Sequence, residues 1–90
     1  MGGKKKTAET CKTKGNLAFQ RQDYRRAVEL YTQGLALNAS HTVLLTNRAA
    51  AYIQLHQYTD AVADAQCAVD LAPDWQKGYF RLAMSHTFQG

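Results

Sequence analysis

Several protein classes are excluded by what this sequence has little of. Its two cysteines, Cys11 and Cys67, lack the C-x-x-C spacing of a disulfide framework or metal site. We therefore expect both to be reduced and semi-buried in a cytoplasmic protein. No apolar run is long enough to cross a membrane and no secretory signal is present, so no membrane contact is expected. A single proline leaves long stretches free to form helix.

An excess of positive charge is confined to the N terminus. The formal net charge is +4, and three of the eleven basic residues are Lys4, Lys5 and Lys6. The other eight basic residues nearly balance the seven acidic ones, so we expect no nucleic-acid binding by bulk charge. Residues 1–7 are predicted to form a flexible basic N terminus. Gly2 does not complete a myristoylation pattern, because residue 6 is Lys rather than Ser or Thr.

The remaining sequence has helical periodicity, and its length allows one small domain. We expect an all-α fold with helices at residues 10–22, 24–38, 42–56, 58–71 and 75–89. The second helix carries a clear apolar stripe, made of Ala27, Val28, Tyr31, Gly34 and Leu35. Asp23 and Asp74 are predicted to cap the second and fifth helices, and Pro73 follows the end of the fourth.

The helices repeat with a period of 34 residues. Tyr24 recurs as Tyr58 and Ala27 recurs as Ala61. A third copy is reached by small residues, at Gly15, Ala49 and Ala83. Small residues recur where helices must approach closely, and aromatic residues recur where a hairpin must be filled. A 34-residue period with two helices per unit indicates a stack of helical hairpins.

On these residues the chain resembles the tetratricopeptide repeat family over residues 8–90. The family's small, aromatic and proline positions are occupied by Gly15, Ala27, Ala49, Ala61, Ala68, Ala83, Tyr24, Tyr58 and Pro73. The resemblance implies a solenoid of five antiparallel helices with a concave peptide groove. It divides the chain into repeat one (8–41), repeat two (42–75) and the first helix of repeat three (76–90).

Two positions in repeat one depart from the family pattern. Ala39 stands where proline is usual, and Gly34 stands where alanine is usual. Glycine inside a helix costs about 1 kcal/mol relative to alanine. We expect a slightly weaker second helix and no change of fold.

The last helix has no following partner in this sequence. Tyr79, Leu82 and Phe88 belong to it, and such arrays usually close with further helices that cover the last apolar face. We expect the chain to be a fragment of a longer protein. The alternative is that a second copy covers this face, which makes self-association through the last helix possible.

Five polar residues have a spacing that would place them on one surface of the stack, namely Lys12, Asn16, Asn47, Lys77 and Arg81. Residues four apart share a helix face, as do Lys12 with Asn16 and Lys77 with Arg81. In a stacked array the first helix of each repeat lines the concave side. Three cations and two amides, with no carboxylate among them, favour an anion such as a peptide C terminus.

The five residues are also similar, in type and spacing, to the carboxylate clamp of chaperone-binding repeat domains of the Hop-type organising co-chaperones. The resemblance implies that they hold the C-terminal EEVD peptide of heat shock protein 70 or heat shock protein 90. Phe19 and Ala50 lie three residues after Asn16 and Asn47 on the same faces. They are expected to form the apolar pocket for the valine of that peptide.

Two other kinds of function were weighed against peptide binding. An enzyme is disfavoured, because His41, His56 and His86 have no partner at metal-ligand spacing and no Gly-rich phosphate loop is present. We therefore expect no catalytic residue, no metal and no cofactor. The alternative that stays open is a repeat scaffold or oligomerisation module that binds a different, non-C-terminal partner.

Overall fold

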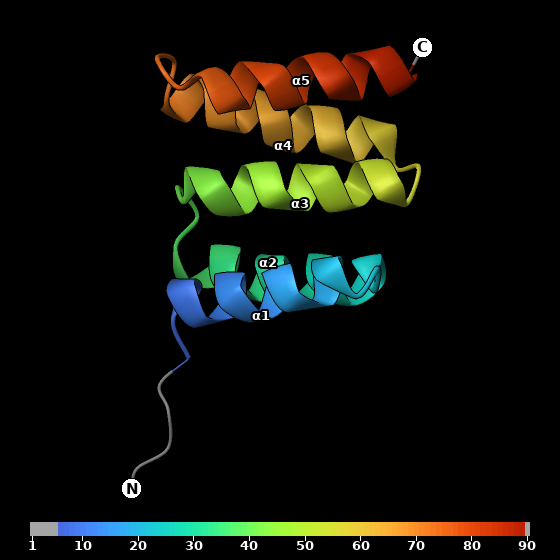
Figure 1. Cartoon of the computed structure of the whole chain (residues 1–90). Coiled ribbons are helices and arrows are strands. Elements are labelled where there is room, and N and C mark those ends of the chain that lie inside the picture. The colour runs from blue at the N-terminus through green and yellow to red at the C-terminus, as the bar shows by residue number, and fades with distance from the viewer. Residues whose placement is uncertain (1–5, 90) are drawn as a thin grey trace, which may run out of the picture.

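The computed structural model describes residues 6–89, which form five helices joined by short turns (Figure 1). In chain order these are α1 (Ala8–Gln20), α2 (Tyr24–Leu37), α3 (Thr42–Gln54), α4 (Tyr58–Leu71) and α5 (Gln76–Gln89). The described part contains no strand, so the all-α prediction is confirmed. The predictions made for Gly2, Lys4 and Lys5 lie outside the described residues.

The helices stack as successive antiparallel hairpins. Each helix packs against the next one along the chain, and α3 also contacts both α1 and α5 (Figure 1). The helices α1, α3 and α5 are the first helices of the three predicted repeats. Their contacts therefore bring side chains separated by more than sixty residues in sequence onto one surface.

The start of α1 was predicted two residues too late, because its capping was not recognised. The Thr7 hydroxyl accepts a hydrogen bond from the backbone N–H of Thr10 (3.1 Å). In return, the Thr10 hydroxyl accepts one from the backbone N–H of Thr7 (2.9 Å). This reciprocal capping box satisfies two otherwise free N–H groups and extends the helix to Ala8.

Of the two helix caps predicted from the sequence, one is confirmed and one is wrong. The Asp23 carboxylate accepts a hydrogen bond from the N–H of Arg26 (3.3 Å), as predicted for the start of α2. Asp74 is not placed to cap α5, because α5 begins at Gln76 and Trp75 precedes its first residue.

The ends of α1 and α3 share one backbone conformation. Gln22 and His56 have φ angles of 64° and 62°, in the left-handed region. The next residue in each case donates its N–H back into the helix, Asp23 to the Ala18 carbonyl and Gln57 to the Tyr52 carbonyl. These are Schellman ends, and they lie 34 residues apart. The ends of both helices were predicted two residues too late because these endings lack the usual glycine.

The core between α1, α2 and α3 depends on two glycines. A Cβ on Gly15 would lie 2.5 Å from Cε1 of Tyr31, so only glycine leaves room for that ring. A Cβ on Gly34 would lie 2.8 Å from Cδ1 of Leu44 and 3.0 Å from Cβ of Cys11. Gly34, which departs from the family pattern, therefore has a packing reason beyond its cost in helix propensity.

A buried ion pair fixes α3 relative to its neighbours. Arg48 on α3 donates two hydrogen bonds of 2.7 Å to the carboxylate of Asp64 on α4, which is 6% exposed. A further nitrogen of Arg48 donates to the Thr32 hydroxyl on α2 (3.1 Å). The hydrogen bonds that Arg48 donates to Asp64 raise the pKa of Arg48 above its usual value. This fork fixes the orientation of the helix that also carries Asn47.

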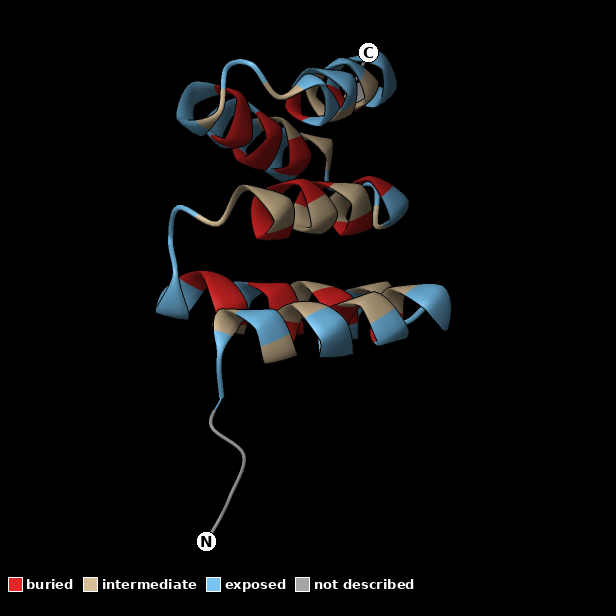
Figure 2. Cartoon of the chain, turned by 60° about the vertical axis from the view of Figure 1, so that its left-hand side comes forward, coloured by how far each residue is buried: buried red, intermediate tan, exposed pale blue. Residues whose placement is uncertain are grey.

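Much of α5 is exposed, as the pale blue parts of its ribbon show (Figure 2). Tyr79, Phe80 and Phe88 are about half exposed, and the Phe88 ring stacks on Tyr58 at 6.0 Å. Leu82 is half-buried and packs against the core between α3 and α4, so it does not belong to the uncovered face.

The two cysteines differ from the expectation that both would be semi-buried. Cys11 is fully buried at 2% exposure, whereas Cys67 is exposed, and both thiols are free. Cys11 packs in the space beside Gly34, and Cys67 lies on the outer side of α4.

Candidate functional site

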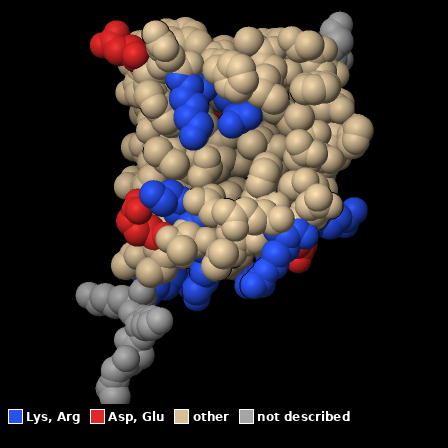
Figure 3. Space-filling view, viewed as in Figure 1, with Lys and Arg blue, Asp and Glu red and all other residues tan. Residues whose placement is uncertain are grey.

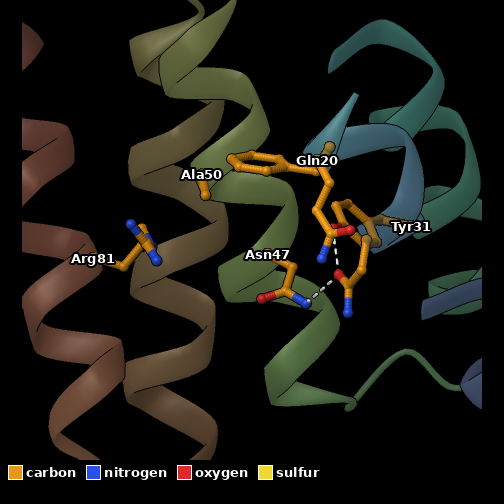
Figure 4. A pocket seen from close by; sticks show the side chains of 7 residues that line it. Gln20, Tyr31, Asn47, Ala50 and Arg81 are labelled. Atoms are coloured by element: carbon orange, nitrogen blue, oxygen red, sulfur yellow. Dashed lines mark hydrogen bonds between the residues drawn. The ribbon is translucent and has the colours of Figure 1, made fainter. Parts of the chain in front are cut away.

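A surface cavity of about 240 Å³ lies between α1, α3 and α5 (Figure 4). It is lined by Asn16, Phe19, Gln20, Tyr31, Asn47, Ala50 and Arg81. Five of the seven residues predicted from the sequence as a binding site are therefore gathered around one space. The other two, Lys12 and Lys77, lie on the helices beside the cavity and do not line it.

The polar floor of the cavity is centred on the Asn16 side chain. Its oxygen Oδ1 accepts a hydrogen bond from the Tyr31 hydroxyl (2.6 Å) and another from Nδ2 of Asn47 (3.2 Å). Figure 4 shows both bonds as dashed lines joining three helices. Asn16 and Asn47 were predicted to lie together; the bond to Tyr31 was not.

Arg81 contributes an unsatisfied donor. Figure 4 shows its side chain extending from α5 toward α3. Its Nε is buried and finds no acceptor among the described residues. Nη1 donates to the Met84 sulfur at 3.4 Å, and the guanidinium carbon lies 5.8 Å from the centroid of the Phe80 ring. Burial lowers the pKa of Arg81 below its usual value, which reflects the cost of holding this charge away from water. A ligand oxygen at this place would satisfy the guanidinium.

The two lysines differ in their surroundings. Lys12 Nζ is 2.9 Å from Oε1 of Glu9, and the other Glu9 oxygen is 2.9 Å from Nε2 of His41. The hydrogen bond from His41, followed by that from Lys12, lowers the pKa of Glu9. Lys77 is exposed, and no ion pair or hydrogen bond to it is found within residues 6–89.

Figure 3 shows the charges on this face. Lys and Arg side chains gather in front of the space between α5 and α3, and the acidic groups lie toward the edges of the face (Figure 3). The side of the cavity near α5 is therefore positive without nearby acidic compensation, a condition that favours an anionic ligand.

The apolar part of the cavity comes from Phe19 and Ala50. The Phe19 ring packs edge-on against Tyr24, with ring centroids 5.1 Å apart. Ala50 is half-buried on α3, facing the same space. A cavity with aromatic and small apolar lining beside several polar donors suits a ligand with a short apolar side chain next to an anion.

Two lining residues were not foreseen from the sequence. Tyr31 was assigned to the apolar stripe of the second helix, which is correct for its ring but gives no information about its hydroxyl. Gln20 lies four residues after Asn16, so the i, i+4 rule that paired Lys12 with Asn16 could have found it.

Metal ligands and membrane-spanning segments were also sought in the structure. Within residues 6–89, no group of three or more His, Cys, Asp or Glu side chains is placed to hold a metal ion. None of the helices over that range has the length and apolar character needed to span a bilayer.

Comparison with known sequences gives relatives that are much longer than this chain. No family model matches it. The Hsp70-Hsp90 organizing protein of Triticum aestivum is 43% identical over 79 residues, which make up 88% of this chain and 14% of that protein. The chain thus spans only about one seventh of the length of this relative.

Two similar solved structures are matched over more than two thirds of their own length, although others are matched over a smaller part. The second repeat domain of Spaghetti (RPAP3), bound to the HSP90 peptide SRMEEVD, has a TM-score of 0.88 and 35% identity, covering 92% of this chain and 77% of that one. The second repeat domain of human RPAP3, in complex with the HSP70 peptide SGPTIEEVD, has a TM-score of 0.86 and 35% identity, covering 92% and 69%. By sequence and by fold, this chain belongs to the tetratricopeptide repeat family.

Proposed function

We propose that this chain is a protein-protein interaction module of a co-chaperone. It binds the acidic C-terminal EEVD peptide of heat shock protein 70 or heat shock protein 90 through a carboxylate clamp. The clamp consists of Lys12, Asn16, Asn47, Lys77 and Arg81. The observation that carries the proposal is the buried Arg81 Nε, which has no acceptor among the described residues beside a cavity floored by two amides.

Each residue has a chemical role in this proposal. Arg81 presents a planar fork that suits a carboxylate, and Lys12 and Lys77 add mobile ammonium donors at either side. Asn16 and Asn47 donate from the floor of the cavity, and Phe19 and Ala50 receive the valine side chain. Two structures of related domains contain peptides that end in EEVD, which supports this choice of ligand.

The proposal extends to the organisation of the chain. The repeats are assigned to residues 8–41 and 42–75, with the first helix of a third at 76–90 and a basic N terminus at 1–7. Thr7 caps α1, and the Lys6 ammonium donates a hydrogen bond to Gln33 on α2 (2.9 Å). Lys6 and Thr7 are therefore both bonded to the first hairpin. The module has no catalytic role and works in the cytoplasm.

Binding is expected in the micromolar range. Charge-assisted hydrogen bonds contribute about 1.5 to 3 kcal/mol each, and ordering a flexible peptide offsets part of their sum. A net value of about −8 kcal/mol corresponds to a micromolar dissociation constant.

The test is a fluorescence polarisation titration with two peptides. One ends in EEVD with a free carboxylate, and the other has the same sequence with an amidated C terminus. Amidation should remove most of the binding, because it replaces the terminal anion with an N–H donor. Equal affinity for both peptides would show that the partner is not recognised by its C terminus. Light scattering without peptide separates self-association through α5 from peptide binding.

A further inference from the structure

The Tyr31 hydroxyl occupies an unusual place for a residue of the second helix. Its side chain starts from α2, which supplies no other residue to the cavity lining, and the residue is only 1% exposed. The ring fits because Gly15 has no side chain, and its hydroxyl then reaches Oδ1 of Asn16 at 2.6 Å. At the same positions of repeat two, 34 residues later, the sequence has Ala49 and Ala65, so no hydroxyl is available there.

The hydrogen bonds around Asn16 occupy its side-chain oxygen and leave its N–H donors free for a ligand. Its oxygen has two lone-pair sites, and both are used, by the Tyr31 hydroxyl and by Nδ2 of Asn47. Rotating the Asn16 amide by half a turn would put its NH₂ group against the NH₂ group of Asn47. Only the Asn16 N–H donors therefore stay available.

The Tyr31 hydroxyl keeps its proton throughout the neutral range. Burial raises the pKa of Tyr31 to about 12. The hydroxyl is thus a donor to Asn16 at any pH at which the domain would meet a peptide, and the orientation of the amide does not change with pH in that range.

We propose that Tyr31 is a positioning residue that fixes the Asn16 amide with its donors available to the cavity. The site is thereby made selective for an acceptor, such as a free carboxylate, over an amidated or donor-bearing terminus. This inference rests on the proposed carboxylate clamp. Without the hydroxyl, only the bond from Asn47 would hold the Asn16 amide, which would then present its oxygen to the cavity more often than in wild type and so repel an anion.

The experiment compares wild type with Tyr31→Phe, which keeps the ring beside Gly15 and removes only the hydroxyl. The dissociation constants of the free-carboxylate and amidated EEVD peptides are measured for both proteins. We expect the free-carboxylate peptide to bind about five- to tenfold more weakly to the variant, consistent with the loss of one oriented hydrogen bond. Binding of the amidated peptide should change less, so the ratio between the two peptides falls.

The matched control is Tyr52→Phe. Tyr52 is half-buried on α3, does not line the cavity, and its hydroxyl has no hydrogen bond to any described residue. This variant should keep both affinities. If the Tyr31 hydroxyl has a purely structural role, Tyr31→Phe should weaken the binding of both peptides by the same factor. The ratio of their dissociation constants would then stay unchanged, which would overturn the inference.

The two proposals fail separately. If wild type itself does not distinguish the two peptides, the carboxylate clamp is wrong. If wild type distinguishes them and Tyr31→Phe keeps the full ratio, only the role of Tyr31 is wrong. If the melting temperature of Tyr31→Phe is far below that of wild type, the inference is tested by NMR of the wild-type protein instead. The Asn16 side-chain N–H resonances must shift with the free-carboxylate peptide and stay in place with the amidated one. Equal shifts with both would contradict the inference.

Discussion

The two sides of the cavity satisfy their polar groups in different ways. On the N-terminal side, formed by α1, Lys12 pairs with Glu9 and the Asn16 oxygen accepts two hydrogen bonds. On the C-terminal side, formed by α5, neither Lys77 nor the Nε of Arg81 has an oxygen partner among residues 6–89. The first side is held in place by the chain itself, and in the proposed clamp the second is completed by a ligand.

Because of this difference, we expect the two sides to contribute unequally to the free energy of peptide binding. The preorganised N-terminal side loses little conformational freedom when a peptide arrives, which reduces the entropic cost of binding. The C-terminal side carries donors whose desolvation is not yet compensated, so a ligand oxygen gains most there. We therefore expect the largest losses of affinity from changes on α5 and smaller ones from changes on α1.

The largest effect is expected for Arg81→Ala. Losing a charge-assisted hydrogen bond of about 1.5 to 3 kcal/mol weakens binding by roughly 10- to 150-fold. Fluorescence polarisation with the free-carboxylate EEVD peptide measures the change, and circular dichroism should show unchanged helicity. Arg81→Lys keeps the charge without the planar fork, so its affinity for the peptide should lie between those of wild type and Arg81→Ala. If Arg81→Ala binds the peptide within twofold of wild type, the C-terminal side of the cavity does not take part in binding.

The two lysines provide the next comparison. Lys77→Ala should weaken binding by about tenfold, at the lower end for a charge-assisted bond. Lys12→Ala should weaken it by only about threefold, because Lys12 must first give up part of its ion pair with Glu9. Both losses should shrink in high salt, since the contacts are ionic and partly exposed. If Lys12→Ala loses more affinity than Lys77→Ala, the expectation that the α5 side contributes more to binding than the α1 side is wrong.

A smaller effect, of opposite sign, is expected for Glu9→Gln. Removing the carboxylate frees Lys12 for the peptide and should tighten binding by about two- to threefold, within the modest range of exposed ion pairs. The pKa of Glu9 is lowered by His41 and Lys12, so Glu9 stays charged in wild type as the pH falls to about 5. The carboxylate charge that this substitution removes is therefore present in wild type at both pH 5 and pH 7.

The control for this variant is Glu29→Gln. Glu29 forms an equivalent i, i+3 ion pair with Arg26 at 3.0 Å, on α2 away from the cavity. It should leave peptide affinity unchanged. Equal tightening by both variants would point to a general effect of net charge rather than to the release of Lys12.

The smallest effect is expected for Arg25→Ala. Arg25 is exposed on α2 and does not line the cavity, so affinity should stay within about twofold in isothermal titration at physiological salt, where distant charges are screened. A clear loss would indicate that the peptide extends over the α2 face, beyond the two sides compared above.

Much of the fold was predictable because its signals are local. Apolar periodicity placed all five helices, and the start and end of α4 were predicted correctly at Tyr58 and Leu71. The errors occurred where a cap used unexpected residues, as with Thr7 and Thr10 at α1 or the left-handed Gln22 and His56. A threonine pair and non-glycine residues in that conformation are weak signals by themselves.

The sequence by itself determined the 34-residue period and the positions of the five polar residues, because both can be read from the spacing of residues along the chain. Only the tertiary structure decided which of those residues have partners. Glu9 meets His41 across 32 residues and Tyr31 meets Asn16 across 15, and both contacts depend on how the helices pack against one another. The same packing buries the Arg81 Nε without an acceptor among residues 6–89. No spacing rule predicts this, since it depends on what α3 places opposite α5.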